Sequence, residues 1–297
     1  MPRDVPRETE RLTAALAVVF VALSGIAAPA ADADAVARGD YLTIAAGCAD
    51  CHTDSKQGDR RYAGGRALAT PFGTFYAPNI TPDLDTGIGR WSDAQFLRAL
   101  REGVRPDGSS YFPVFPYPSF TKITDDDARA IKAYLFAQPA VRQSNRPHDV
   151  AFPFSWRFLL NGWKLLFFSP GPFRPVPERG KSYNRGAYLV TALAHCGECH
   201  TPRNWFGATE PSRFLAGTSH GPDGKAVPNI SSDLEAGIGK WSDDDIVTLL
   251  KDGQTPDFDF VGGAMAEVVK NTARLTDSDR RAIAAFLRSV PAVPSPR

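Results

Sequence analysis

Two short cysteine motifs constrain this chain more than any other feature. The first is Cys48-Ala49-Asp50-Cys51-His52, and the second is Cys196-Gly197-Glu198-Cys199-His200. Two cysteines that are separated by two residues and followed directly by histidine are typical of c-type haem attachment. One turn of backbone presents both thiols to the two vinyl groups of one porphyrin, and the adjacent histidine reaches the iron from one face. The sequence therefore predicts two covalently bound haems, with His52 and His200 as proximal iron ligands.

The chain is internally duplicated over roughly residues 33–141 and 182–293. Each repeat holds one cysteine motif and the same short segments around it. The matched pairs are Arg38–Leu42 with Arg185–Leu189, Pro78–Ile80 with Pro228–Ile230, Asp85–Asp93 with Glu235–Asp243, Ile123–Asp125 with Leu275–Asp277, and Pro139–Val141 with Pro291–Val293. Because each motif has its own set of these segments, we expect two tandem domains of one kind.

Other uses of the cysteines have to be weighed. All four cysteines of the chain lie in the two motifs, so no thiol remains for a disulfide bond. A Cys-x-x-Cys pair also occurs in thioredoxin-type redox sites and in zinc sites. A zinc site would need the two pairs to meet in space although each lies in its own repeat. A redox dithiol has no use for the histidine that follows both pairs, so haem attachment is the interpretation that we prefer.

The pattern of apolar residues predicts a small helical domain in each repeat, and hence an all-α fold class. In the first repeat, helical spacing predicts helices over residues 35–46, 91–102 and 125–137. Thr124 and Thr276 are the expected N-caps of the last helix in each repeat. The stretches between the helices are rich in glycine and proline, as expected of loops that wrap around a prosthetic group.

Composition excludes few classes of protein. The formal net charge is +1 and the chain has no basic tract, so nothing favours a nucleic-acid partner. The N-terminus is more informative, because an apolar run over residues 12–26 precedes the small residues 28–30. This pattern predicts a cleaved signal peptide over residues 1–30, with an uncleaved membrane anchor as the alternative. Either a cleaved signal peptide or a membrane anchor would place the rest of the chain outside the cytoplasm, where bacteria attach c-type haem.

Residues 142–181 resemble neither repeat and form an aromatic-rich linker. Prolines at 153 and 170 bound a run of apolar side chains that predicts one helix of about three turns. We prefer the interpretation that this helix packs between the two haem domains and fixes their separation. The alternative is a surface that docks on a partner protein or a bilayer, since large exposed apolar patches usually mark contacts.

The second axial position differs between the two predicted haems. Met265 follows a haem motif in an expected loop, and a thioether there raises the reduction potential of the iron. The offset that aligns Trp91 with Trp241 places Phe115 opposite Met265. Since Met1 leaves with the signal peptide, the first haem has no methionine ligand from its mature chain. The remaining candidates are His148, the strongest, followed by His195, His220, Lys122 and Tyr117.

With these motifs in hand, the chain resembles the multi-haem cytochrome c subunits of bacterial periplasmic dehydrogenases. The resemblance rests on residues 184–189 leading to 196–204, on the paired Gly-Ile-Gly-x-Trp-Ser segments, and on residues 101–108. It implies two class I cytochrome c domains, at 31–141 and 182–297. It also implies that Trp91 and Trp241 lie against the haems, and that the carbonyls of Pro78 and Pro228 orient the ligand histidines.

These observations predict an electron carrier with two covalently bound haems c. The cofactor-binding residues are Cys48, Cys51, His52, Cys196, Cys199, His200 and Met265, and the iron ligands among them are His52, His200 and Met265. The expected partners are the catalytic subunit of a periplasmic dehydrogenase and a downstream electron acceptor, with peripheral membrane association also allowed. The alternatives are a haem enzyme that acts at the first haem, similar to a peroxidase or thiosulfate dehydrogenase, and a shuttle without a fixed partner.

Overall fold

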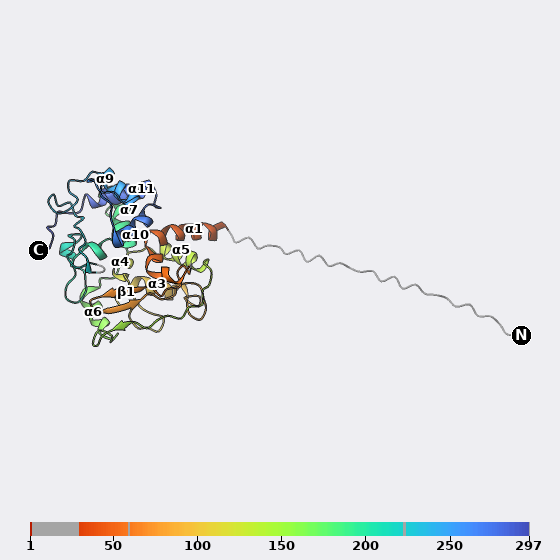
Figure 1. Ribbon diagram of the computed structural model, residues 1–297. Helices are drawn as coiled ribbons and strands as arrows, with labels where there is room; N and C mark the ends of the chain where they lie inside the picture. Colours follow the sequence, from red (N-terminus) through yellow and green to blue (C-terminus); the bar gives the residue numbers. More distant parts are fainter. Residues whose placement is uncertain (2–29, 59, 222–223, 297) are drawn as a thin grey trace.

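The computed structural model describes Met1 and residues 30–58, 60–221 and 224–296 (Figure 1). The expected signal peptide therefore lies outside the described residues, apart from its first and last residue. No helix within the described part of the chain is long and apolar enough to cross a membrane.

The two repeats fold into corresponding sets of helices. The first set is α1 (Ala30–Ala45), α2 (Cys48–His52), α3 (Asp93–Glu102), α4 (Tyr117–Phe120) and α5 (Asp125–Phe136). The second set is α7 (Gly180–Tyr188) with its π-helical continuation η3 (Leu189–Leu193), then α8 (Gly197–His200), α9 (Asp243–Asp252), α10 (Gly263–Thr272) and α11 (Asp277–Leu287). Short 3₁₀ turns lie at Ser55–Gln57, Pro177–Arg179 and Pro211–Arg213.

Side-chain caps explain where the helices begin. Ser92 accepts a hydrogen bond from the backbone N–H of Gln95 in a capping box, so α3 starts at Asp93 and Trp91 lies outside the helix. Thr124 and Thr276 cap α5 and α11 as predicted. The three predicted helices of the first repeat are confirmed, with ends within two residues of those expected, except that α1 begins five residues earlier, at Ala30.

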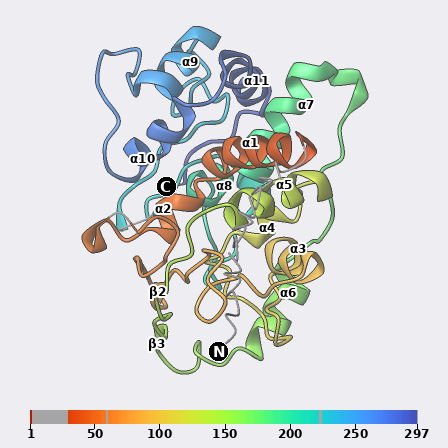
Figure 2. The same cartoon turned by 90° about the vertical axis from the view of Figure 1, so that its right-hand side faces the viewer.

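Two pairs of helices cross with the most extensive contact, α1 with α5 and α7 with α11. Each crossing is at a glycine, Gly39 in α1 and Gly186 in α7, where a Cβ atom would collide with backbone of the partner helix. In the two views, α7, α9 and α11 occupy the upper part of the body and α3 and α6 the lower part, with α1 between them (Figures 1 and 2).

Both repeats contribute to one hydrophobic core. Its fully buried members include Leu42, Ile123 and Ile131 from the first repeat and Leu189, Leu193 and Ile283 from the second. The repeats are therefore packed directly on one another, in addition to being joined by the intervening segment.

The all-α expectation misses a small antiparallel sheet. Strands β1 (Ala67–Thr70) and β2 (Gly73–Tyr76) form a hairpin, and β3 (Asp149–Val150) pairs with the other edge of β2. This hairpin lies in a part of the first repeat that has no counterpart among the matched segments, so the comparison of the repeats could not reveal it. The fold is mostly helical, not all-α.

The predicted apolar helix between the prolines is present as α6 (Leu159–Phe167). Its Leu160 is buried against Phe75 and Phe112 beneath the sheet, in a second small core. Trp163 donates a hydrogen bond from Nε1 to the carbonyl of Phe206 in the second repeat, at 2.9 Å. The helix therefore packs on the first repeat and touches the second through Trp163 and Phe167, and part of its apolar surface stays exposed.

Candidate functional site

The two predicted proximal histidines have the same environment. His52 is the last residue of α2 and His200 is the last residue of α8. Nδ1 of His52 lies 2.7 Å from the carbonyl oxygen of Pro78, and Nδ1 of His200 lies 2.8 Å from that of Pro228. A carbonyl can only accept, so Nδ1 carries the proton and Nε2 has a free lone pair. Burial lowers the pKa of both imidazoles, which keeps them neutral, as a metal ligand must be.

The chemistry of the cysteines fits a haem better than a redox dithiol. All four thiols are free. Burial raises the pKa of Cys48 and of Cys196 to about 12. A thioredoxin-type nucleophile needs the opposite shift, because the thiolate is the reactive form. These neutral thiols are placed one helical turn apart beside a neutral imidazole, as two thioether bonds and one iron ligand would require.

The zinc alternative finds no support in the described residues. Within residues 30–58, 60–221 and 224–296, no three side chains among His, Cys, Asp and Glu converge into a group that could hold a metal ion. A structural zinc site uses four such ligands. The two cysteine pairs therefore belong to two separate sites.

The distal side of the second site departs from the expectation. We expected Met265 in a loop, but it is the third residue of helix α10, where it is half-buried. The expectation of a loop is wrong because Gly262-Gly263 suggested one, whereas residues 264–272 contain no proline or glycine to interrupt a helix. The role of Met265 as an iron ligand stays a prediction.

The corresponding segment of the first repeat is shorter and aromatic. Phe115 precedes the four-residue helix α4, and its ring lies 5.4 Å from Tyr111 and 5.8 Å from Phe120 between centroids. Prolines at 113, 116 and 118 remove backbone N–H donors, so this stretch cannot form the ten-residue helix that α10 makes. Phe115 offers no atom that could bind iron.

The structure gives the other candidate ligands of the first haem different surroundings. Nδ1 of His148 accepts from the backbone N–H of Tyr76 at 3.2 Å, and its ring packs on Phe75 and Phe112 in the sheet core. His220 pairs with its neighbour Ser219 on the surface. Lys122 Nζ lies 3.4 Å from the carbonyl of Thr191. Tyr117 is fully buried against Trp163 and Phe168.

His195 has an environment that sequence reasoning missed. It immediately precedes Cys196, as Gly47 precedes Cys48, and both residues have a positive φ, 40° and 60°. That backbone region favours glycine, so histidine is held there against its preference. Its ring contacts Phe120 of the other repeat, at 5.4 Å between centroids. The only signal in the sequence was the replacement of glycine by histidine at this position.

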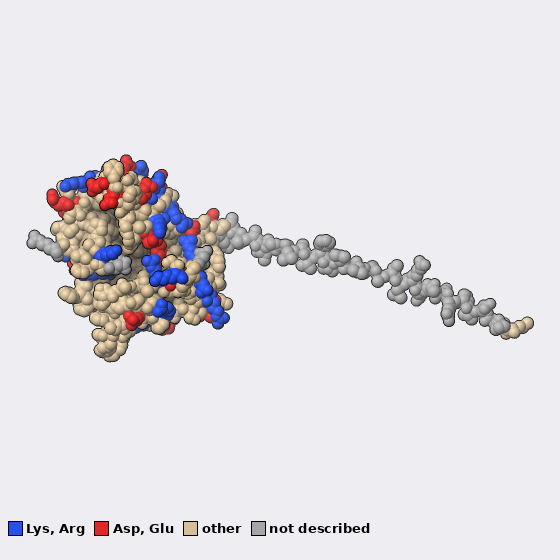
Figure 3. Space-filling view, in the orientation of Figure 1, with Lys and Arg blue, Asp and Glu red and all other residues tan. Residues whose placement is uncertain are grey.

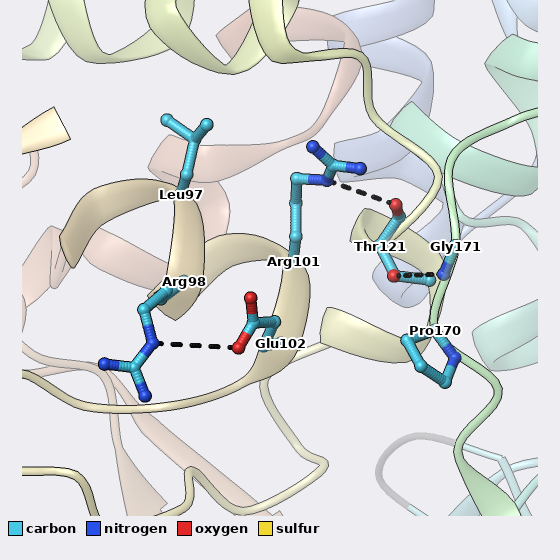
Figure 4. Close-up of a pocket in the computed structure, with 7 residues that line it drawn as sticks. All are labelled: Leu97, Arg98, Arg101, Glu102, Thr121, Pro170 and Gly171. Atoms are coloured by element: carbon cyan, nitrogen blue, oxygen red, sulfur yellow. Dashed lines mark hydrogen bonds and ion pairs between the residues drawn. The ribbon is translucent and has the colours of Figure 1, made fainter. Parts of the chain in front are cut away.

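A cavity of about 330 Å³ lies between α3 and the segment around Pro170 and is separate from the predicted haem ligands (Figure 4). An Arg98–Glu102 ion pair and a hydrogen bond from the Gly171 N–H to Thr121 Oγ1 order its wall. None of the predicted cofactor-binding residues lines it, so we assign it no part in the chemistry.

Comparisons with known proteins identify the family of the chain. The family model of cytochrome c matches residues 36–137, which is the first repeat. A diheme cytochrome c-type protein of Cereibacter sphaeroides is 46% identical over 86% of this chain and 86% of its own length. The cytochrome subunit of a fructose dehydrogenase of Gluconobacter japonicus is 42% identical over 86% of the chain. The cytochrome c subunit of a quinone alcohol dehydrogenase of Gluconobacter oxydans is 38% identical over 96% of the chain.

The relatives differ in length. The chain spans 53% of the fructose dehydrogenase subunit and 60% of the alcohol dehydrogenase subunit, whereas it spans most of the diheme protein. The chain therefore belongs to the family of the cytochrome c subunits of bacterial dehydrogenases, as a di-haem c-type cytochrome that carries two covalently bound haems and transfers electrons.

Proposed function

We propose that this cytochrome accepts electrons from the catalytic subunit of a periplasmic dehydrogenase and passes them through its two haems to a downstream acceptor. The observation that carries the proposal is the repetition of one site: a Cys-x-x-Cys-His turn whose histidine is bonded to a proline carbonyl, present once in each repeat. Two such centres would let one molecule take up an electron at one site and deliver it from the other.

We assign the residues of each site as follows. Cys48 and Cys51 would hold one porphyrin, Cys196 and Cys199 would hold the other, and the free Nε2 atoms of His52 and His200 would ligate the irons. The haem supplies the one-electron redox chemistry, and the protein supplies attachment, orientation and potential. The proline carbonyls fix the tautomer and ring orientation of each histidine and raise its basicity toward iron.

The two distal sides support different potentials for the two haems. Met265 on α10 is the distal ligand that we assign to the second haem, and a thioether favours the ferrous state. Its counterpart Phe115 is apolar and packed among aromatic rings. We therefore infer that Met265 would give the second site the higher potential when both haems are bound.

An exposed apolar surface supports a stable protein partner. It consists of Phe152, Phe154, Trp156, Phe158, Leu165, Leu166, Trp205 and Phe206. Leu165 is 86% exposed and Leu166 is 72% exposed. Phe206 packs on Phe167 at 5.7 Å between centroids, so α6 and the second repeat contribute to one continuous surface. The lower part of the body, where α6 lies, shows few charged side chains (Figure 3).

The charges near this surface favour a protein over a bilayer. Arg157 donates to the carbonyl of Ser110, and Lys164 donates to the carbonyls of Glu102 and Gly103. Both cations are therefore turned into the protein. A helix that lies on a membrane usually presents Lys and Arg to anionic lipid, whereas permanent subunit interfaces are apolar. We propose that the dehydrogenase subunit covers this surface.

Reconstitution with purified components tests the electron-carrier function. The holoprotein is mixed with the catalytic subunits of alcohol, gluconate, fructose and N-heterocycle dehydrogenases in turn, each with its substrate, and haem reduction is followed by absorbance. We expect reduction with one class of catalytic subunit and no reduction by any substrate alone. Reduction by a substrate without a second protein would contradict the proposal and favour a haem enzyme.

A paired substitution tests the docking surface. Leu165→Asp combined with Leu166→Asp places two charges on α6, and Leu234→Asp places one on an exposed leucine of the second repeat that is outside this surface. We expect only the α6 variant to lose its complex with the catalytic subunit, with haem spectra unchanged in both. Unimpaired complex formation, together with lost binding to phospholipid vesicles, would instead identify a membrane surface.

Mass spectrometry of the denatured protein tests the haem attachment. We expect two haem masses on the wild-type chain and one on a Cys48→Ala/Cys51→Ala variant. Release of all colour on denaturation would contradict covalent attachment.

A further inference from the structure

The turn that follows α3 in the first repeat recurs after α9 in the second. Each turn begins at a glycine with a left-handed backbone, Gly103 or Gly253, which ends the preceding helix. The backbone N–H of Tyr111 donates to the carbonyl of Gly103 at 2.8 Å, and that of Val261 donates to the carbonyl of Gly253 at 2.9 Å. The two repeats therefore keep the same register from these glycines as far as Tyr111 and Val261.

The register changes by two residues before the next helix. A Cβ atom placed on Gly103 would collide with the ring of Tyr117 in α4, and one placed on Gly253 would contact Val269 in α10 at 3.5 Å. Tyr117 and Val269 therefore occupy the same place relative to the two glycines. Tyr117 follows its glycine by fewer residues than Val269 does, so the segment that leads to this contact is two residues shorter in the first repeat.

Met265 lies within this segment of the second repeat. Depending on where the first repeat lacks the two residues, the counterpart of Met265 is Pro113, Val114 or Phe115. None of these three side chains carries a nitrogen, oxygen or sulfur atom that could ligate iron. Phe115 and the attachment residue Cys48 both pack against the main core, whereas Val114 packs in the small core beneath the sheet. Phe115 therefore shares a core with the first attachment motif.

The histidine that follows the first repeat is committed elsewhere. Nδ1 of His148 accepts a hydrogen bond from the backbone N–H of Tyr76 at 3.2 Å. A neutral imidazole whose Nδ1 accepts carries its proton on Nε2, and burial lowers the pKa of His148, which favours this neutral form. The ring also packs on Phe75 and Phe112. His148 therefore has the opposite tautomer from the two proximal histidines and offers no lone pair to iron.

The remaining candidate ligands are held away from this role. Burial raises the pKa of Tyr117, which disfavours the phenolate that would bind iron. Lys122 directs Nζ to a backbone carbonyl of the second repeat, at 3.4 Å. His195 is constrained by its neighbour Cys196, which attaches the second haem, and His220 is exposed at the surface. None of these candidates in the described part of the chain is therefore free to bind the first iron from its distal side.

We propose that the first haem site binds a small, uncharged diatomic ligand, such as carbon monoxide or nitric oxide, and that Met265 closes the second site to the same ligand. The polarity of the distal side decides which ligands a haem prefers. The rings of Tyr111 and Phe120 flank Phe115, at 5.4 Å and 5.8 Å between centroids. Aromatic surroundings of this kind disfavour anionic ligands, because taking an ion out of water costs free energy.

Binding at this site is a reversible ligation of ferrous iron. One bond forms between the iron and the carbon or nitrogen atom of the ligand, and no proton or electron is exchanged with another reactant. The inference goes beyond the electron-carrier function, since it depends on the difference between Phe115 and Met265 and not on any partner protein.

Titration of the reduced holoprotein with carbon monoxide tests the site. The protein with both haems attached is reduced with dithionite without oxygen, and absorbance changes count the carbon monoxide bound per chain. We expect one molecule per wild-type chain. Phe115→Met should lower this number to none at a gas concentration that saturates the wild type, because the gas must then displace a thioether. Met265→Ala should raise it to two.

A matched control and a second readout separate ligation from folding. Phe115→Leu keeps an apolar side chain without a ligand atom and should still bind one carbon monoxide. In the ferric protein, the charge-transfer absorption of an iron–thioether bond counts the methionine ligands. We expect one such bond in the wild type and in Phe115→Leu, two in Phe115→Met and none in Met265→Ala. The unaltered site of each variant reports whether the chain has folded.

Other stoichiometries would overturn the proposal. If the wild type binds no carbon monoxide, the first haem has a protein ligand, and a gain of one molecule in His148→Ala or in His195→Ala would identify it. If the wild type binds two, Met265 does not close the second site. The titration needs no dehydrogenase. A chain that binds the gas but is reduced by no catalytic subunit therefore refutes only the proposed function, and a chain that is reduced but binds no gas refutes only this inference.

Discussion

Replacing Gly186 by alanine should destabilise this protein although alanine is the better helix former. A Cβ atom at Gly186 would lie 2.9 Å from Cβ of Phe286 and closer still to the carbonyl oxygen of Ala282, both on α11. No rotamer change relieves a clash with backbone, so α7 and α11 must separate. Overpacking of this kind costs about 1–3 kcal/mol or more, and the gain in helix propensity returns about 1 kcal/mol. We expect a net loss of about 2 kcal/mol in the free energy of unfolding.

The same substitution elsewhere in the chain provides the control. Gly162 lies within α6, and a Cβ atom there would meet no other described atom within 4 Å. Gly162→Ala should therefore stabilise the protein by up to about 1 kcal/mol. Denaturant unfolding of the two holoproteins, followed by circular dichroism, measures both values. At about 2–4 °C per kcal/mol for a chain of this size, Gly186→Ala should also lower the melting temperature by roughly 4–8 °C. A neutral or stabilising Gly186→Ala would refute the argument that the helix crossing requires glycine.

Three further predictions concern the distal ligand, acid stability and a helix cap. Met265→Ala should lower the reduction potential of one haem and leave the other unchanged in a potentiometric titration; equal shifts in both would refute the assignment. Burial alone would raise the pKa of Asp279, but hydrogen bonds from Arg185 and Tyr41 hold that pKa below its usual range. The ionised carboxylate therefore stabilises the folded protein fully above the unfolded-state pKa of about 4. This stabilisation is lost as the pH falls through the lower pKa of the folded state. Asp279→Asn should therefore flatten the decline of unfolding free energy between about pH 5 and pH 2, and an unchanged decline would count against this. Ser242→Ala removes the side-chain cap of α9 and should cost about 1 kcal/mol in denaturant unfolding, with no loss expected if the cap is not used.

Local patterns predicted the parts of the fold that depend on local contacts. The caps at Thr124 and Thr276 gave the starts of α5 and α11, because a side-chain oxygen bonds a backbone N–H three residues away. The apolar run between prolines gave α6. The prediction failed for strand β3, whose residues 149–150 pair with residues 73–74 of β2, far away in the sequence. Strand pairing over such a separation has no local signature.

In the candidate site, too, the features that depend on local sequence could be predicted and the others could not. The spacing of Cys48, Cys51 and His52 is a property of one helical turn, so the attachment chemistry could be derived without coordinates. The helical position of Met265 could not, because the preceding glycines suggested a loop and α10 extends from Gly263 to Thr272. The corresponding helix of the first repeat, α4, is short because of the prolines around it. Those prolines are visible in the sequence, but where they end the helix depends on the path of the backbone.

The amino-acid sequence by itself determined that this protein is a duplicated cytochrome with two haem-attachment turns and one methionine suited to be a distal ligand. Only the tertiary structure decided how the two halves meet. Asp50 and Asn271 are separated by 221 positions, and Tyr41 and Asp279 by 238, so no spacing rule could have paired them. Attachment motifs and caps depend on neighbours within one turn of helix, whereas the contact between the haem domains depends on the folding of the whole chain.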